Sequence, residues 1–344
     1  MRLFGDRDAN RWQYNLALFR LLFKDTNSGL NDVGEALRKD YVFVANLFRQ
    51  DFPVPGFTSQ IAFVRNSDYE SDVIHYDKNG FLVIPAQIGD DRGYNYNVNY
   101  VGVNGDGHFG RFNLTTSGYW AFGHLTHNQF SPVPNNNGAH INAFFAAAEP
   151  SIDFDYLRLR FSGLFQSGDS NPQGGHATGF DSVFENPQFA GSDASYFIRQ
   201  SLPYIGGGIV GLNHPNGVLA DVRASKIEGQ SNFINSGLIL AGFGTDTDFL
   251  PELRMSTNFN FLRAVDVQPL QFLRHQGNIT HDLGYDLSVA FTYRPLDTQN
   301  IIFRVSGAAL IPANGLKAIY KTDPGLFSGP NFLYAAMINM ILTY

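Results

Sequence analysis

Residues 331–344 read NFLYAAMINMILTY, and they separate into two faces when every second residue is taken. A period of two indicates a β-strand. One face has no charge, and its only hydrogen-bonding groups are the phenols of Tyr334 and Tyr344, towards the two ends of the strand. Such a face suits contact with lipid, with the aromatic rings at the headgroup level. Because a core strand of a soluble β-sandwich would also have one apolar face, the choice depends on whether the rest of the chain repeats the pattern.

The composition favours a protein with little water-facing surface. Aromatic residues make up 15% of the 344 residues, 35 residues are glycine, and only 16% are charged, against roughly 25% charged residues in an ordinary soluble domain. The absence of cysteine is compatible with an exported, oxidising location. The net charge of −7 argues against a nucleic-acid partner.

The ways in which this chain could cross a membrane are limited. No stretch has the roughly 18 uncharged apolar residues that a transmembrane helix needs, so any span is expected to consist of strands. The amino-terminal sequence MRLFGDRDANR lacks the apolar core and the cleavage site of a signal peptide. Since an outer-membrane protein requires a signal, the sequence predicts either a mature chain or a gene model that has lost its beginning.

Twelve segments of about ten or more residues show a period of two, and no long segment has the 3.6-residue period of an amphipathic helix. The sequence therefore predicts an all-β protein in which residues 1–344 form one domain. The predicted strands are residues 11–24, 40–51, 57–66, 94–103, 108–122, 139–149, 153–166, 231–244, 252–263, 282–294, 300–310 and 331–344.

The predicted connections alternate between long and short along the whole chain. The short ones carry turn residues, among them Asn104–Gly107 and Pro150. This alternation is typical of a transmembrane antiparallel up-and-down β-barrel, with tight periplasmic turns and long outer loops. A Greek-key sandwich has no reason to keep it. An even number of strands would place both chain ends on the side of the short turns.

Several predicted strands have one apolar and one polar face. In residues 282–294 and 252–263, large apolar side chains alternate with Gly, Ser, Asn and charged residues. In residues 94–103, tyrosine and valine alternate with Asn95, Asn97 and Asn99. The polar set of each strand is predicted to face a water-filled lumen.

Three short sequences resemble the alginate-export family of outer-membrane proteins and its porin-like relatives: HYDKNGF (75–81), ATGFDSVF (177–184) and DLGYDL (282–287). Members have about eighteen strands and a signal, so the chain resembles their carboxy-terminal two thirds. The final strand, residues 331–344, resembles the closing strand of bacterial outer-membrane β-barrels, which the barrel-assembly machinery reads, with Tyr344 where those barrels usually have Phe. The resemblance implies passive export or uptake of a polar solute, a class that includes anions.

The faces assigned to the lumen carry more arginine than acid. A row of guanidinium groups on a water-filled wall attracts anions and offers bidentate docking to carboxylates, so we predict selectivity for anionic solutes. The alternative is that the arginines pair with loop acids such as Glu185 and hold the loop in place. The predicted lining comprises Arg111, Arg158, Arg160, Arg254, Arg304, Asp286, Asn95, Asn97 and Asn99.

The longest predicted connection, residues 167–230, is expected to fold into the lumen as a constriction, because long loops in compact proteins are usually functional. Its candidate residues are Phe180, Asp181, Phe184 and Glu185. An outer lid, or a contact to lipopolysaccharide or to a neighbouring subunit, is the alternative.

The sequence gives no support for an enzyme. None of the nine histidines has HxxxH or HExxH spacing, and the close pair His124 and His127 is explained by solvated loop positions. There is no GxSxG motif, and the glycine-rich runs lack the lysine of a phosphate loop. We therefore predict no catalytic residue, no metal and no cofactor.

The sequence as a whole predicts a channel of the bacterial outer membrane for passive diffusion of small polar solutes, with a preference for anions. The alternatives are a dedicated exporter of an acidic polysaccharide such as alginate and a soluble all-β carbohydrate-binding protein. The expected partners are outer-membrane lipid and lipopolysaccharide, the barrel-assembly machinery through residues 331–344, and a small polar solute or acidic oligosaccharide.

Overall fold

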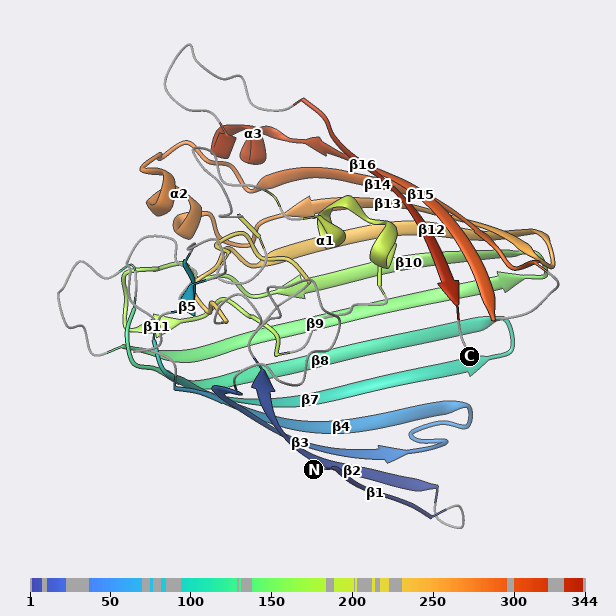
Figure 1. Ribbon diagram of the computed structural model, residues 1–344, viewed down its shortest axis with the longest axis horizontal. Coiled ribbons are helices and arrows are strands. Elements are labelled where there is room, and N and C mark those ends of the chain that lie inside the picture. Colours follow the sequence, from blue (N-terminus) through green and yellow to red (C-terminus); the bar gives the residue numbers. More distant parts are fainter. Residues whose placement is uncertain are drawn as a thin grey trace.

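The strands of the computed structural model form one large antiparallel sheet (Figure 1). The structure describes residues 2–7, 11–22, 37–69, 75–76, 82–84, 94–128, 130, 138–183, 189–200, 202, 212–213, 217–222, 231–295, 300–320 and 331–342. Thirteen strands follow one another in the sheet in sequence order. They are β1 (Arg2–Arg7), β2 (Trp12–Leu22), β3 (Leu37–Arg49), β4 (Phe57–Asp68), β7 (Tyr96–Phe109), β8 (Phe112–Leu125), β9 (Ala139–Phe154), β10 (Leu157–Gln166), β12 (Leu238–Leu250), β13 (Leu253–Arg263), β14 (Asp282–Tyr293), β15 (Ile301–Pro312) and β16 (Leu333–Leu342).

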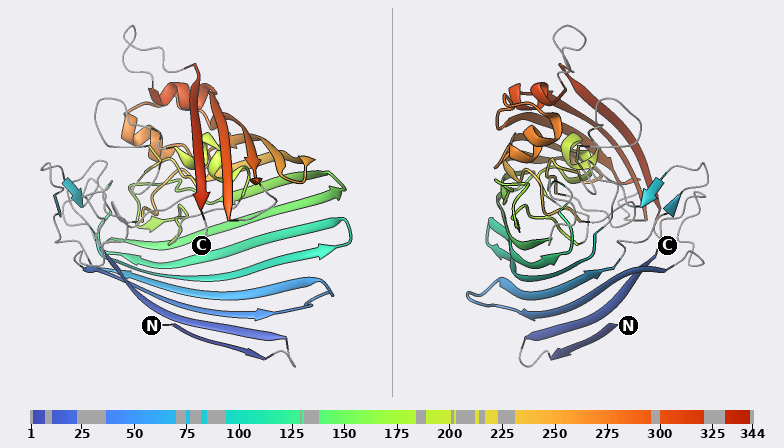
Figure 2. Two further views of the ribbon diagram at one scale, coloured as in Figure 1. Left: turned by 45° about the vertical axis from the view of Figure 1, so that its right-hand side comes forward. Right: turned by 90° about the vertical axis from the view of Figure 1, so that its left-hand side faces the viewer.

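The all-β, up-and-down prediction is confirmed, and each of the twelve predicted strands corresponds to a strand of the sheet. The sequence patterns missed β1, which pairs with β2. Because of this additional strand, Arg2 pairs with Ala17 halfway along β2 and does not lie at the end of the sheet that the last residues of β16 reach. In the part of the chain that the structure describes, β1 and β16 are the two edge strands, and the sheet curves between them (Figure 2).

The connections alternate as predicted and define two ends of the sheet. One end, the short-turn end, has connections such as residues 110–111, 155–156 and 251–252. The other, the long-loop end, has connections such as residues 126–138 and 167–237. Figure 1 shows two helical segments, Gln268–Arg274 and Asn314–Tyr320, at this second end.

Two predicted turns are wrong because their residues continue a strand. Asn104–Gly107 lies inside β7, and the turn comes at residues 110–111. A side chain at Gly105 would meet the Phe57 ring at 2.1 Å, so this glycine makes room for an aromatic ring across the strands. Pro150 likewise lies inside β9, where the pairing with β10 is interrupted because proline has no N–H to donate.

The remaining elements belong to the connections. They are β5 (His75–Tyr76) paired with β6 (Leu82–Ile84), β11 (His176–Ala177) paired in parallel with β9, a 3-10 turn (Ser192–Ala194), α1 (Tyr196–Arg199), α2 (Gln268–Arg274) and α3 (Asn314–Tyr320). Among the described residues, no helix has the length and apolar character to cross a membrane.

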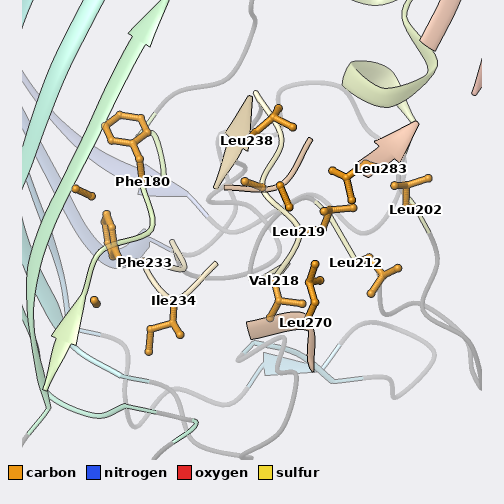
Figure 3. Packing of buried hydrophobic residues seen from close by; sticks show 14 of the residues in the cluster. Phe180, Leu202, Leu212, Val218, Leu219, Phe233, Ile234, Leu238, Leu270 and Leu283 are labelled. Atoms are coloured by element: carbon orange, nitrogen blue, oxygen red, sulfur yellow. The ribbon is translucent and has the colours of Figure 1, made fainter. Parts of the chain in front are cut away.

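The two faces of the sheet have opposite surroundings. The outer face exposes large apolar side chains at alternate positions; Val103, Phe161 and Ile338 have 62%, 51% and 79% of their surface exposed. The inner face is covered at the long-loop end by the described part of residues 167–237, which we call the plug. An apolar cluster forms where the plug packs on the inner face of the sheet. Figure 3 shows its members Phe180, Leu202, Leu212, Val218, Leu219, Phe233, Ile234, Leu238, Leu270 and Leu283.

Candidate functional site

The inner face at the short-turn end carries a row of arginines and carboxylates on β9, β10, β12 and β13, which we call the ladder. It comprises Glu149, Asp153, Arg158, Arg160, Asp246, Asp248 and Arg254. These residues come together because they occupy alternate positions on neighbouring antiparallel strands, with Arg158 opposite both Asp153 and Asp246 in the register.

Every arginine of the ladder is paired with a carboxylate. Arg254 donates two hydrogen bonds to Asp248, from Nε at 2.6 Å and from Nη2 at 2.8 Å. Arg160 donates to Asp246 from Nε at 2.9 Å and to the Asn258 side chain at 3.0 Å, and its Nη1 lies 3.8 Å from Glu149. Such forked pairs fix the guanidinium plane and offset its charge locally. The wall therefore presents both signs of charge.

The other residues of the predicted lining are dispersed. Arg111 lies in the turn between β7 and β8, with 68% of its side chain exposed and 3.9 Å from Asp155, so its prediction as a residue of the lumen wall is wrong. Arg304 lies on the inner face of β15, opposite Thr292 and Asn339. Asp286 also lies on the inner face, but under the plug.

The predicted faces of β7 are inverted. Tyr96, Val98 and Tyr100 are buried on the inner face, where Tyr96 contacts the ring of Phe233 edge-on. The alternate positions on the outer side of the strand include Asn97 and Asn99, so these asparagines and the adjacent Asn95 do not line the lumen. The inversion has a physical reason: the inner face here is covered by an apolar plug, so that apolar side chains are needed on it.

A buried carboxylate of β14, that of Asp286, binds the plug. Asp286 is 1% exposed and accepts hydrogen bonds from Ser195 Oγ at 2.6 Å, from the backbone N–H of Tyr196 at 2.9 Å and from that of Phe197 at 3.4 Å. Asn260 of β13 donates to the same carboxylate at 3.1 Å. The three plug donors lie at the start of α1, where backbone N–H groups have no partner within the helix. Asp286 therefore acts as a latch between the wall and the plug.

Aromatic contacts hold a second part of the plug against the wall. Phe180 packs on Tyr100 of β7 and Phe145 of β9, with ring centroids 6.0 Å and 5.2 Å away. The Tyr100 hydroxyl donates to the backbone oxygen of Asp181 at 2.9 Å. Phe180 thus contributes to fixed packing, whereas Phe184 and Glu185, the other half of the predicted constriction, lie outside the described residues.

The plug also has an internal polar framework that the sequence patterns missed. The carboxylate of Asp181 accepts from the backbone N–H groups of Ser182 and Asn232. The buried amide of Asn235 donates to the backbone oxygens of Phe180 and Asn232. These bonds explain why residues 231–237, predicted as the start of a strand, form turns within the plug, since Asn side chains bond readily to nearby backbone.

One buried acid lies where the plug leaves β10. Asp169 is 2% exposed, and burial, with a smaller contribution from the charge of Asp266, raises the pKa of its carboxyl to about 6. Burial likewise raises the pKa of Asp266, against a lowering by His281. The backbone N–H groups of both acids donate to consecutive plug residues, Asn235 and Ser236. The pair therefore couples this junction to pH.

Comparisons with known proteins find similar structures only. No family model matches, and no curated protein matches. Among solved structures, the chain is similar to a mutant form of the ferric enterobactin receptor PfeA of Pseudomonas aeruginosa, at a TM-score of 0.40 and 12% identity over 92% of this chain and 41% of that one. It is also similar to OccK3 (OpdO) of Pseudomonas aeruginosa, at a TM-score of 0.30 and 15% identity over 87% and 71% of the two chains. The siderophore receptor PirA of Acinetobacter baumannii gives 0.30 and 12% over 96% and 53%.

The chain spans less than half the length of PfeA. The resemblance to the alginate-export family stays a prediction.

Proposed function

We propose that this protein is a channel of the bacterial outer membrane through which small polar solutes diffuse passively. One observation carries the proposal: the sheet exposes its apolar side chains and covers its polar ones. Phe161, Phe291 and Val305 are 51%, 42% and 49% exposed on the outer face, whereas Asn258 and Ser288 are 7% exposed on the inner face. A soluble β-sandwich buries its apolar faces against a second sheet, and the described strands of the large sheet form no second layer.

The distribution of aromatic residues supports a membrane position for the outer face. Phe57, Phe109 and Phe112 stack on one another at the short-turn end. Towards the long-loop end, Trp120 contacts Phe122 and Phe144. Aromatic residues at both edges of an apolar band are typical of transmembrane barrels, where they lie at the two interfaces.

The solute class follows from the inner wall. The paired charges of the ladder favour a polar path without a strong excess of either sign, whereas the arginines considered alone favour anions. The short-turn half of the inner face carries the ladder, and the plug covers the long-loop half. Passage of a solute is therefore expected to depend on displacement of the plug.

The experiment is conductance of the purified protein in a planar bilayer, with reversal potentials in a salt gradient. A channel with a reversal potential near zero supports the mixed-sign wall, and a shift towards the anion potential supports anion selectivity. Block by an acidic oligosaccharide, but not by a neutral one of equal length, would favour the polysaccharide exporter. Absence of any conductance, from protein that shows heat-dependent gel mobility, would contradict the channel.

A further inference from the structure

Three histidines lie side by side on neighbouring strands at the long-loop end. His124 of β8 is the direct register partner of His140 of β9, and His140 is the register partner of His176 of β11. The ring centroids are 5.4 Å apart in the first pair and 6.0 Å apart in the second. We call these residues the histidine row.

The histidine row lies on the outer face and is accessible. All three side chains are exposed, while the adjacent Leu125 and Ile141 are each 2% exposed on the inner face. Trp120, which alternation places on the same face of β8 as His124, stacks with Phe144. The row therefore continues the aromatic band towards the loops.

The imidazole rings of the row are free of competing side-chain hydrogen bonds within the described part of the chain. By contrast, His108 bonds to the side chain of Asn113, and His281 bonds to the backbone oxygen of Ala264. A neutral imidazole with an unshared ring nitrogen is a good ligand for divalent zinc, copper and nickel.

The spacing of the first pair matches a shared metal ion. An imidazole nitrogen binds Zn²⁺ at about 2.0–2.1 Å, which places the ring centroid roughly 3.2 Å from the ion. Two such rings at a tetrahedral angle have centroids about 5.2 Å apart. The observed 5.4 Å for His124 and His140 is close to this value, and the 6.0 Å for His140 and His176 is longer.

We propose that His124 and His140 form a two-histidine site for a divalent transition-metal ion, with water completing its coordination. A two-ligand site is consistent with the finding that no group of three or more His, Cys, Asp or Glu among the described residues could hold a metal. The ion would join β8 to β9 next to the place where β11, a segment of the plug, pairs with β9. The proposal does not depend on the protein being a channel.

The test uses Cu²⁺ and Zn²⁺ with the untagged purified protein in detergent, after treatment with a chelator. Calorimetry with either ion is expected to show one saturable site per chain. The electron paramagnetic resonance spectrum of the Cu²⁺ form is expected to show coupling to two nitrogen nuclei. Absence of saturable binding, or coupling to a single nitrogen, would overturn the proposal.

Variants identify the pair. His124→Ala and His140→Ala are each expected to lose the saturable site, whereas His176→Ala and the control His108→Ala are expected to keep it. Retention of the site in His140→Ala, or its loss in His108→Ala, would contradict the assignment. Loss of the site in His176→Ala, together with its retention in His124→Ala, would show that the metal binds His140 and His176 instead and would also contradict the proposal. Heat-dependent gel mobility reports folding, and a glutamine substitution at the same position, such as His140→Gln, replaces any alanine variant that fails this control.

Discussion

Replacing Asp286 is expected to release α1 from the wall. The two shortest plug bonds to this carboxylate come from Ser195 Oγ at 2.6 Å and from the Tyr196 N–H at 2.9 Å. A hydrogen bond to a charged group contributes about 1.5–3 kcal/mol, so Asp286→Ala removes about 3–6 kcal/mol of gross attachment. The cost of burying the carboxylate offsets part of this, and we expect a net loss of about 3 kcal/mol. Since 1.4 kcal/mol corresponds to a factor of ten, the displaced state should be populated about a hundredfold more.

Trypsin measures this displacement directly, because α1 ends at Arg199. When opening and closing are fast, the cleavage rate follows the population of the open state. Asp286→Ala should therefore be cut after Arg199 about a hundredfold faster than the wild type, and its bilayer conductance should rise. The matched control Asp248→Asn alters a ladder carboxylate that bonds Arg254 and should leave cleavage unchanged. Unchanged cleavage in a folded Asp286→Ala protein refutes the latch, and Ser195→Ala, which loses one bond to Asp286, repeats the test with a milder change.

Three further predictions concern other parts of the molecule. The pKa of Asp169 is about 6 in the folded protein against an ordinary 3.8, so the folded state is favoured while this carboxyl is protonated, fully below pH ~4, and the advantage is lost as the pH rises through 6. Urea unfolding in lipid vesicles should therefore show a decrease of about 2 kcal/mol in the free energy of unfolding between pH 4 and pH 7. Asp169→Asn should abolish this decrease. Gly123→Ala should cost at least about 1–3 kcal/mol, because its Cβ would lie 2.0 Å from the Asn97 backbone oxygen, whereas Gly163→Ala, with nothing within 4 Å, should be neutral in the same assay. Phe161→Arg should destabilise the protein by about 2–4 kcal/mol in lipid while Phe161→Leu does not, and equal stability of the two variants would contradict a lipid-facing β10.

The strands of the sheet could be predicted from the sequence because the pattern that identifies a strand is local. Alternation with a period of two depends only on neighbouring residues, so that strands such as 282–294 are visible without any tertiary knowledge. The exact turns were less predictable. A run such as Asn104–Gly107 has the composition of a turn, and only the Phe57 ring across the strands shows why glycine is needed inside β7.

The candidate site was only partly predictable because it depends on which groups meet. The alternation on β13 predicts the face on which Arg254 lies, but its partner Asp248 belongs to another strand, and the pair depends on the register of β12 with β13. For β7 the alternation was visible in the sequence, but it did not show which of the two sets of side chains faces inward. Polarity identifies a lumen face only where water covers it, and the plug covers Tyr96 and Tyr100.

The plug itself shows why one inner face carries two kinds of chemistry. Its long-loop half buries apolar side chains such as Val98 and Leu283 under the plug, and a single carboxylate, Asp286, faces the start of α1 there. In the short-turn half, the arginines of the ladder have partners on the wall itself, as Arg160 shows with Asp246, and Glu149 also accepts from the backbone N–H of Ala190 in the plug. A plug that leaves would therefore break the bonds of Asp286, remove this one bond to Glu149 and expose the apolar cluster, but it would leave the arginine–aspartate pairs of the ladder intact. In the proposed channel, this asymmetry implies that opening is limited at the long-loop half, so variants of the plug should change how often the channel opens, and variants of the ladder should change which ions pass.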